Sequence, residues 1–269
     1  MVMVGAVLYV EALGRTRLAV EERVKKTKEG LEGSGLRVKY VDVGEVIEDE
    51  AMDPLRFSAL LEAGVEGTLE EVFTAVVAYA PTLVEILSPG RLEIDRSALE
   101  SLLLGIRDEV LLRMKELGAS PVVPDVREVP SPPIGFDEEE LWEIIYQGRG
   151  ILYGVSISMK APDKKTAGDL VSRLLLVEGC GINSLNVMEA GNGLFNVDIE
   201  AVSSFESMVS LVARYLPRRL EIMEPEVIDV TAAELQNSLS DLGAFLNSLL
   251  MGEDFEKAYE RDTFSFKLA

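Results

Sequence analysis

The sequence predicts an α+β fold in which one β-α-β-β-α-β unit occurs twice in tandem, each copy followed by an extra long helix. Three observations predict this fold. The chain has 269 residues, 48% of them hydrophobic, which is enough for two packed cores. The apolar residues switch between the spacing of strands and that of helices. A shift of 136 positions, which places Pro81 on Pro217, aligns a long segment with a later one without a gap.

The internal repeat runs from Glu70 to Leu103 and keeps nine identical residues in 34 aligned positions. Prolines and apolar spacing stay in register through a helix, a strand and a second helix. This favours a common origin over a chance match of two amphipathic segments. The identical pairs are Glu70/Glu206, Val76/Val212, Tyr79/Tyr215, Pro81/Pro217, Glu85/Glu221, Ile86/Ile222, Pro89/Pro225, Leu99/Leu235 and Leu103/Leu239.

The first copy shows each element of the unit in order. Thr68 and Glu71 form a capping box, in which each side chain satisfies a free backbone group at the start of a helix. Pro81 ends that helix, because proline disfavours helical geometry in the residue before it. In the second strand, alternation places Val38 and Tyr40 on one face. The expected strands are 6–12, 36–43, 57–67, 83–87 and a short one at 92–94, and the expected helices are 17–32, 68–80 and 95–117.

The second copy repeats this order. A Gly-Asn-Gly turn at 191–193 between two alternating runs is a hairpin signal. Ser203 and Glu206 suggest another capping box, and Thr231 is the expected N-cap of the last long helix. In both copies the order of the first six elements resembles the ferredoxin-like, split βαβ arrangement. The expected strands are 151–159, 182–190, 194–201 and 219–223, and the expected helices are 164–177, 205–216 and 231–251.

The repeat divides the chain into four parts. A semi-extended linker with five prolines separates the copies and ends in a short acidic helix. The first copy alone carries an acidic insertion at 44–56, which is expected to be a solvated loop. Upstream of the gapless segment, Val7-Leu8-Tyr9 resembles Ile151-Leu152-Tyr153. The tail is expected to add an edge strand, through Phe264, Phe266 and Leu268, or to hang free. The parts are a first repeat at 1–117, the linker at 118–149, a second repeat at 150–251 and the tail at 252–269.

The chain is strongly acidic, with a formal net charge of −21. Nucleic acids are bound mainly by Lys and Arg that neutralise phosphates, so this charge argues against DNA, RNA and anionic membrane surfaces. No segment approaches the ~20 apolar residues that span a bilayer. The apolar start lacks the basic region and cleavage site of a signal peptide. A cytoplasmic protein is expected, and the scarcity of glutamine beside abundant glutamate favours a thermophilic source.

The chain contains no histidine and a single cysteine, Cys180. The missing histidine excludes Ser-His-Asp and Cys-His catalysis and every metal site that needs a histidine ligand. A single cysteine cannot form an internal disulfide, and Cys180 is expected to be a small buried hydrophobe. Carboxylates remain as acid–base groups or as ligands for a bound magnesium ion. No cofactor, metal ligand or catalytic residue is assigned.

Seven residues are candidates for ligand binding. Glu85 and Glu221 occupy matched places in the fourth strands and would form a carboxylate pair if the copies pack around a pseudo-twofold axis; otherwise they face solvent. Tyr79 and Tyr215 end matched helices, where they would contact a ligand or simply pack their rings. The remaining candidates are a basic cluster that would hold an anion or only balance surface charge: Arg214, Arg218 and Arg219.

The duplicated scaffold without a catalytic motif favours a non-enzymatic protein that binds a small ligand or a protein partner. The alternative is an enzyme that uses carboxylates and magnesium on a phosphorylated or acyl small molecule, with Glu85, Glu221 and the arginines brought together. A homodimer would cover exposed edge strands and is a general expectation for such sheets.

Overall fold

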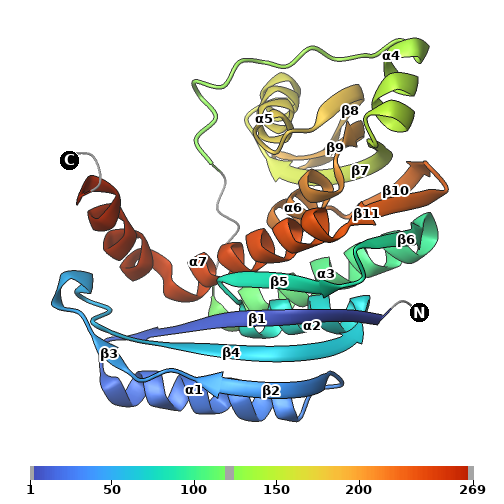
Figure 1. Cartoon of the computed structure of the whole chain (residues 1–269). Coiled ribbons are helices and arrows are strands. Elements are labelled where there is room, and N and C mark those ends of the chain that lie inside the picture. Colours follow the sequence, from blue (N-terminus) through green and yellow to red (C-terminus); the bar gives the residue numbers. More distant parts are fainter. Residues whose placement is uncertain (1–2, 119–123, 266–269) are drawn as a thin grey trace. The chain divides into compact units, whose positions relative to one another are not determined.

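The structure is a computed structural model that describes residues 3–118 and 124–265, with side chains described up to residue 250. The chain forms two compact units (Figure 1). The first unit combines the chain up to Gly90 with the part from Leu235 onward, and the second unit is Arg91–Glu234.

The first unit contains a sheet with the strand order β2-β4-β1-β5, in which every neighbouring pair is antiparallel. Its elements in chain order reproduce the split βαβ arrangement of the ferredoxin-like fold, as the sequence predicts. The short β3 (Ile47–Glu48) of the insertion pairs with β4 and is followed by a 3-10 turn, Glu50–Met52. The remaining elements are β1 (Met3–Gly14), α1 (Arg17–Glu32), β2 (Arg37–Val43), β4 (Phe57–Thr68), α2 (Leu69–Tyr79) and β5 (Leu83–Ser88).

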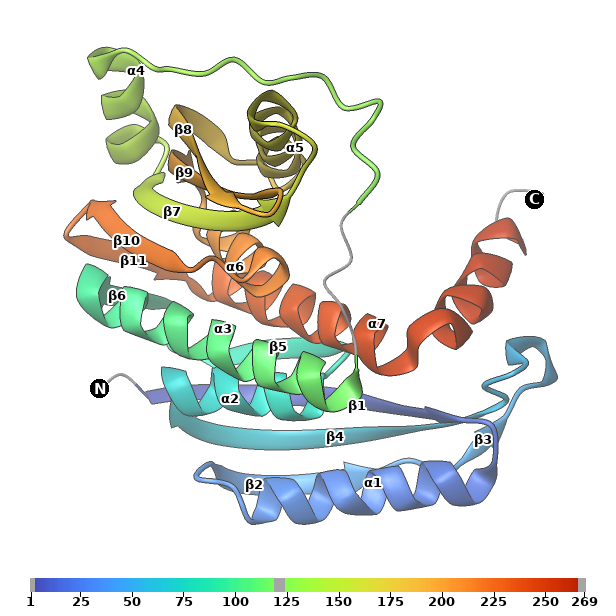
Figure 2. The same ribbon diagram turned by 180° about the vertical axis from the view of Figure 1, so that it is seen from behind.

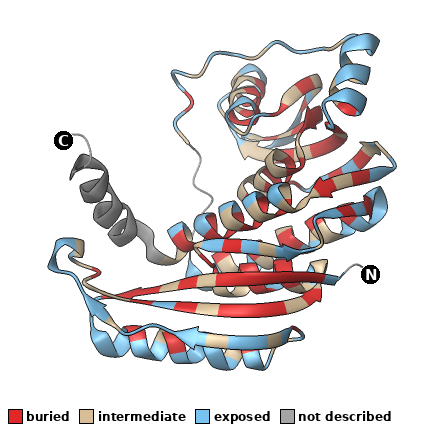
Figure 3. Cartoon of the chain, viewed as in Figure 1, coloured by how far each residue is buried: buried red, intermediate tan, exposed pale blue. Residues whose placement is uncertain are grey.

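The core of the first unit lies between this sheet and the helices α1 and α2. Alternate residues of β1, such as Val4, Ala6 and Leu8, are fully buried. Both helices contact β1 and β4, and the views from the front and from behind agree that α1 lies against β2 (Figure 2). Figure 3 shows the buried residues concentrated along β1 and β4. The opposite face of the sheet is called the outer face below.

The second unit contains a sheet of the same kind, with the strand order β10-β7-β9-β8. Helix α5 packs on β8, β9 and β7. The predicted hairpin turn is present, since Asn192 and Gly193 both adopt positive φ between β8 and β9. The elements of this sheet layer are β7 (Ile151–Lys160), α5 (Lys164–Val177), β8 (Gly181–Gly191), β9 (Leu194–Ser203), α6 (Phe205–Tyr215) and β10 (Arg219–Glu224).

Each long helix packs in the unit that does not contain the main sheet of its own half of the chain. Helix α3 (Arg96–Leu117) belongs to the second unit, where Glu100 Oε2 accepts a hydrogen bond from the backbone N–H of Ile222 at 3.2 Å. Helix α7 (Ala232–Ser265) belongs to the first unit from Leu235 onward, where Gln236 Oε1 accepts from the backbone N–H of Ile86 at 3.1 Å. Both helices thereby satisfy the outer edge of a fourth strand, which would otherwise be free. Each compact unit therefore joins a sheet from one half of the chain with the long helix of the other half.

The bounds of the elements agree between the two halves of the chain at a shift of 136 residues. The agreement holds for α2 and α6, for β5 and β10, and for the first residues of α3 and α7. It also holds for β6 (Arg91–Asp95) and β11 (Val227–Thr231), which pair with each other in the second unit. The sequence predicts β6 as a short strand but misses β11.

Three local predictions are wrong. Val38 and Tyr40 do not share a face, because a β-bulge between them lets Val38 pair with Val65 and Tyr40 with Gly64. The N-cap of α6 is Ser204, which accepts from the backbone N–H of Ser207, so Ser203 and Glu206 form no capping box. The expected edge strand is absent up to Ser265, because α7 continues to that residue; a tail that hangs free stays a prediction, and Phe266 and Leu268 lie outside the described residues.

The upstream alignment of the two first strands is also wrong. β5 places Leu83 opposite Tyr9, and β10 places its equivalent, Arg219, opposite Ser156. Tyr9 therefore corresponds to Ser156 and not to Tyr153, which is fully buried. The proposed alignment is displaced by three residues, and an odd displacement moves every side chain of a strand to the other face.

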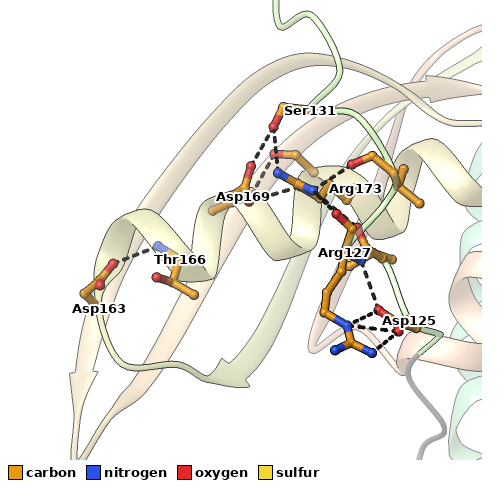
Figure 4. A network of polar contacts seen from close by, with 11 residues as sticks. Asp125, Arg127, Ser131, Asp163, Thr166, Asp169 and Arg173 are labelled. Carbon is orange, nitrogen blue, oxygen red and sulfur yellow. Dashed lines mark hydrogen bonds and ion pairs between the residues drawn. The ribbon is translucent and has the colours of Figure 1, made fainter.

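The linker is attached to α5 of the second unit through Arg173 (Figure 4). The guanidinium of Arg173 donates to the backbone carbonyls of Val126 (3.3 Å), Arg127 (3.2 Å) and Val129 (2.7 Å). Asp169 pairs with Arg173 at 3.0 Å and accepts from the hydroxyl of Ser131 at 2.7 Å. The predicted acidic helix is present as α4 (Glu138–Trp142), followed by a π-helical turn at Glu143–Gln147. Pro121 lies outside the described residues.

Candidate functional site

The outer face of the first sheet brings tyrosines and carboxylates from four strands together. Tyr9 of β1 lies directly opposite Glu62 of β4. Tyr40 of β2 lies opposite Gly64, the second residue after Glu62 on the same strand. Glu85 of β5 lies opposite Val7, which is two residues from Tyr9. Cross-strand partners and residues two apart on a strand share one face, so these side chains are neighbours. Tyr9, Tyr40, Glu62 and Glu85 are called the tyrosine–glutamate row below.

Each tyrosine of the row donates a hydrogen bond to a carboxylate. The hydroxyl of Tyr40 donates to Glu62 Oε1 at 2.8 Å, and the hydroxyl of Tyr9 donates to Glu85 Oε2 at 3.4 Å. The row thus consists of two tyrosine–carboxylate pairs that alternate across the sheet. Because both hydroxyls act as donors, the acceptor capacity that remains on the carboxylates is available to a further donor.

The ring of Tyr40 is positioned by a glycine. A Cβ at Gly64 would lie only 2.7 Å from Cδ1 of Tyr40, so the ring occupies the space above this residue. Only glycine permits such close approach at this point of the strand. The bulge in β2 turns Tyr40 onto the outer face, and Gly64 then lets its ring lie flat enough to reach Glu62.

The carboxylates hold both tyrosines in the protonated form. The hydrogen bond to Glu62 is the main cause that raises the pKa of Tyr40 to about 12, and partial loss of hydration and the charges of Glu62 and Asp42 contribute. Partial loss of hydration and the charges of Glu62 and Glu85 raise the pKa of Tyr9 as well. The two carboxylates of the row therefore carry its negative charge, and its two phenols stay neutral.

Two exposed leucines lie beside the row, and two basic side chains lie farther along the same face. Leu60 and Leu83 flank the row and are each 47% exposed. Farther along β4, Glu66 forms ion pairs with Lys39 at 3.2 Å and Arg37 at 3.7 Å. Glu66 is thereby neutralised. Asp42 of β2 lies opposite Glu62 and adds a further carboxylate beside the row.

Glu85 and Glu221, the two matched glutamates, lie at equivalent points of separate units. Glu85 belongs to the tyrosine–glutamate row, whereas Glu221 lies exposed on β10 opposite Gly154. The hypothesis that the two carboxylates face each other remains a prediction.

Tyr79 and Tyr215, the two matched tyrosines, pack between the helices of their own unit. The ring of Tyr79 lies against Gly30 of α1, where a Cβ would approach its hydroxyl to 2.8 Å. The hydroxyl of Tyr215 donates to Glu178 Oε1 at 2.8 Å. Loss of hydration, reinforced by Glu178, raises the pKa of Tyr215, and loss of hydration raises that of Tyr79. Both positions fit a packing role.

The three arginines of the predicted basic cluster point to different partners. Arg214 lies 3.9 Å from Glu178, whose carboxylate also accepts from the hydroxyl of Ser210 at 2.7 Å. The backbone N–H of Arg218 donates to Ser156, at the start of β10. Arg219 reaches along the outer face of its sheet, where its guanidinium lies 4.0 Å from the position a Cβ would take at Gly154. The carboxylate of Glu178, which the sequence analysis did not single out, is the partner of Arg214 and of Tyr215.

Cys180 is buried, as predicted. It accepts a hydrogen bond from the hydroxyl of Tyr153 at 3.4 Å, and that hydroxyl also lies 3.0 Å from Ser203 Oγ. Burial raises the pKa of the Cys180 thiol to about 11. The thiol is therefore protonated at neutral pH and a poor nucleophile.

No group of three or more His, Cys, Asp or Glu residues is arranged to hold a metal ion in the part of the chain whose side chains are described. Over the same part, no helix combines the length and apolarity that crossing a bilayer requires.

No curated protein matches the sequence. Among solved structures, a candidate glycine cleavage system transcriptional repressor is similar with 11% sequence identity and a TM-score of 0.21, over 84% of this chain and 100% of that one. A protein-family match extends over residues 5–257, nearly the whole sequence. The chain therefore belongs to the MJ0538 family.

Proposed function

We propose that the chain is a non-enzymatic binding protein made by duplication of one ferredoxin-like unit. The shared bounds of α2 and α6 and of β5 and β10 support the duplication. So do the matched contacts of the long helices, since Gln236 on Ile86 repeats Glu100 on Ile222 at the shift of 136 residues. Two equivalent side chains that satisfy two equivalent backbone groups are not expected from unrelated segments.

The tyrosine–glutamate row is the observation that carries the binding function. Its phenols and carboxylates lie on the sheet face opposite α1 and α2, beside exposed Leu60 and Leu83. Phenol rings, leucines and carboxylates together offer both apolar contact and directed polar groups, as ligand sites do. The alternative hypothesis, a carboxylate-based enzyme, has less support. It needs Arg214 to bind a substrate anion, but Arg214 pairs with Glu178. A homodimer and a cytoplasmic location stay predictions.

A thermal-shift screen of the full chain tests this function. A panel of metabolites, nucleotides, amines and short peptides should contain at least one compound that raises the melting temperature. Tyr40→Ala should abolish that stabilisation. Tyr146→Ala is the matched control, because Tyr146 is also exposed and donates to a glutamate, Glu224, at 3.0 Å. No stabilising compound, or equal losses in both variants, would reject the function.

A further inference from the structure

We propose that β2 pairs antiparallel with β2 of a second molecule of this chain, so that two first sheets join edge to edge. This inference goes beyond the proposed function and does not need a ligand at the tyrosine–glutamate row. It follows from the open edge of β2 and from the way its charged and apolar side chains are divided between the two faces of the sheet.

β2 is the outermost strand of the first sheet. Among the strands that the structure describes, it pairs only with β4. The exposed residues of β2 are Arg37, Lys39, Tyr40, Asp42 and Val43. The side of β2 that faces away from β4 therefore presents backbone N–H and C=O groups that a further strand can satisfy.

β8 holds the same outermost place in the second sheet, but there the chain itself covers part of the edge. Ile134 of the linker forms a parallel bridge with Ile182, whose carbonyl also accepts from the backbone N–H of Gly135 at 3.0 Å. The backbone N–H of Phe136 donates to the side chain of Asn183 at 3.1 Å. No strand or bridge of the described residues covers β2 in this way, so its edge is the one left for a partner.

The bulge in β2 divides the side chains of this strand between the two faces of the sheet. The side chains opposite buried residues of β4, on the helix side, are Val38, Val41 and Val43. The side chains on the outer face, which lie opposite Gly64 and Glu62 or pair with Glu66, are Arg37, Lys39, Tyr40 and Asp42. On this face the positive charges precede Tyr40 and the negative charge follows it, so the two ends of the strand carry opposite charges.

One antiparallel register between two molecules matches both faces over the length 37–42. Residues that lie opposite each other in an antiparallel pair share one face of the sheet. In this register the pairs, each formed twice around a twofold axis, are Arg37 with Asp42, Val38 with Val41 and Lys39 with Tyr40. A shift by one residue in either direction would place Val41 opposite Arg37 or Lys39 and mix the two faces.

The charges of β2 favour this register over other arrangements. The side chain of Arg37 is 79% exposed and only 3.7 Å from Glu66, so its guanidinium is accessible to Asp42 of a second molecule. Parallel strands would place like charges beside each other, which destabilises a pair. Just beyond the strand, Leu36 would cover Val43, which is 46% exposed. These local contacts have to outweigh the repulsion between two chains that each carry a net charge of −21.

Light scattering of the full chain after size exclusion tests the proposal, in about 0.15 M salt, which screens charges more than about 8 Å apart. The wild type should have the mass of two chains. Arg37→Asp and Asp42→Arg each place like charges opposite each other and should each give the mass of one chain. An equimolar mixture of the two variants should restore the mass of two chains, because every changed residue then meets an opposite charge. Arg219→Asp, at an exposed arginine that also begins a strand, is the matched control and should keep the mass of two chains.

Four results would overturn the proposal. A wild type with the mass of one chain at every concentration would exclude the pair. Variants at Arg37 and Asp42 that keep the mass of two chains would place the contact on another surface. A mixture that stays at the mass of one chain would exclude this register, and an equal loss in Arg219→Asp would indicate a general effect of charge. None of these results decides the thermal-shift screen, so the edge pairing and the proposed binding function can fail separately.

Discussion

The ring of Tyr40 lies across Gly64, with Cδ1 2.7 Å from the point where a Cβ would stand. Gly64→Ala should therefore displace the ring, break the contact with Glu62 and lower the free energy of unfolding by about 1–3 kcal/mol, as overpacking does. Urea denaturation would measure the loss. Gly154→Ala is the control, because this strand glycine has only ordinary contacts and its replacement should change stability little. Equal stabilities of the two variants would contradict the account of Tyr40.

The docking of α7 on the first unit depends on Gly243. A Cβ at this position would collide with the carbonyl oxygen of Pro81, so Gly243→Ala should destabilise the protein by about 1–3 kcal/mol or more. Gly105→Ala, in the interior of α3 with open space around it, should instead stabilise by up to about 1 kcal/mol. Thermal melts of both variants check the sign. A stabilising Gly243→Ala would show that α7 does not pack against Pro81.

The pKa of Tyr40, raised to about 12, makes stability depend on alkaline pH. The folded pKa lies above the unfolded value of 10.0, so the folded state binds more protons between these values. The contribution of Tyr40 to stability is complete below pH 10 and is lost as the pH rises toward 12. Glu62→Gln should lower the pKa of Tyr40, which phenolate absorbance would follow, whereas Glu66→Gln should not. An unchanged titration in Glu62→Gln would refute the hydrogen bond.

The attachment of the linker to α5 depends on the shape of the Arg173 guanidinium. Arg173→Lys keeps the charge, but a single ammonium nitrogen cannot contact the carbonyls of 126–129 and also Asp169 and Ser131, which the guanidinium reaches with separate nitrogens. Hydrogen exchange over 126–131 should become faster, with little change in the rest of the second unit. Arg37→Lys, at an exposed arginine that forms only a long ion pair, is the control. Unchanged exchange over 126–131 in Arg173→Lys would show that the contacts do not hold the linker.

Local signals in the sequence predict most elements of the fold. The capping box at Thr68 and Pro81 fix the bounds of α2, and the same spacing recurs at Ser204 and Pro217 for α6. The antiparallel order of each sheet follows from the order of elements. The caps and ends of these helices depend on neighbouring residues only, which explains why one sequence is enough to find them.

Features that depend on distant partners were missed. The strand β11 is only five residues long and pairs with β6, more than a hundred residues earlier, so its partner is not a neighbour in the sequence. The apolar stripes of α3 and α7 predict that one face is buried, but they do not specify against which sheet. The sequence therefore could not predict that α3 belongs to the second unit and α7 to the first.

The site was predicted only in part, for the same reason. Glu85 was found through the repeat, but Tyr9, Tyr40 and Glu62 were not. Their meeting depends on the register of β1 and β4 and on the bulge before Tyr40, which shifts that side chain to the outer face. The available signal along β4 was Glu62 and Glu66, four residues apart and therefore on one face, and these residues do not identify a partner.

Fluorine NMR of the full chain labelled with fluorotyrosine tests the binding role of the tyrosine–glutamate row most directly. Phe variants at Tyr9, Tyr40 and the packed tyrosines Tyr79 and Tyr215 assign the resonances. On titration with a compound that stabilises the protein, the Tyr9 and Tyr40 resonances should shift in a saturable manner while those of Tyr79 and Tyr215 stay in place. Saturable binding that leaves Tyr9 and Tyr40 unchanged would contradict the account.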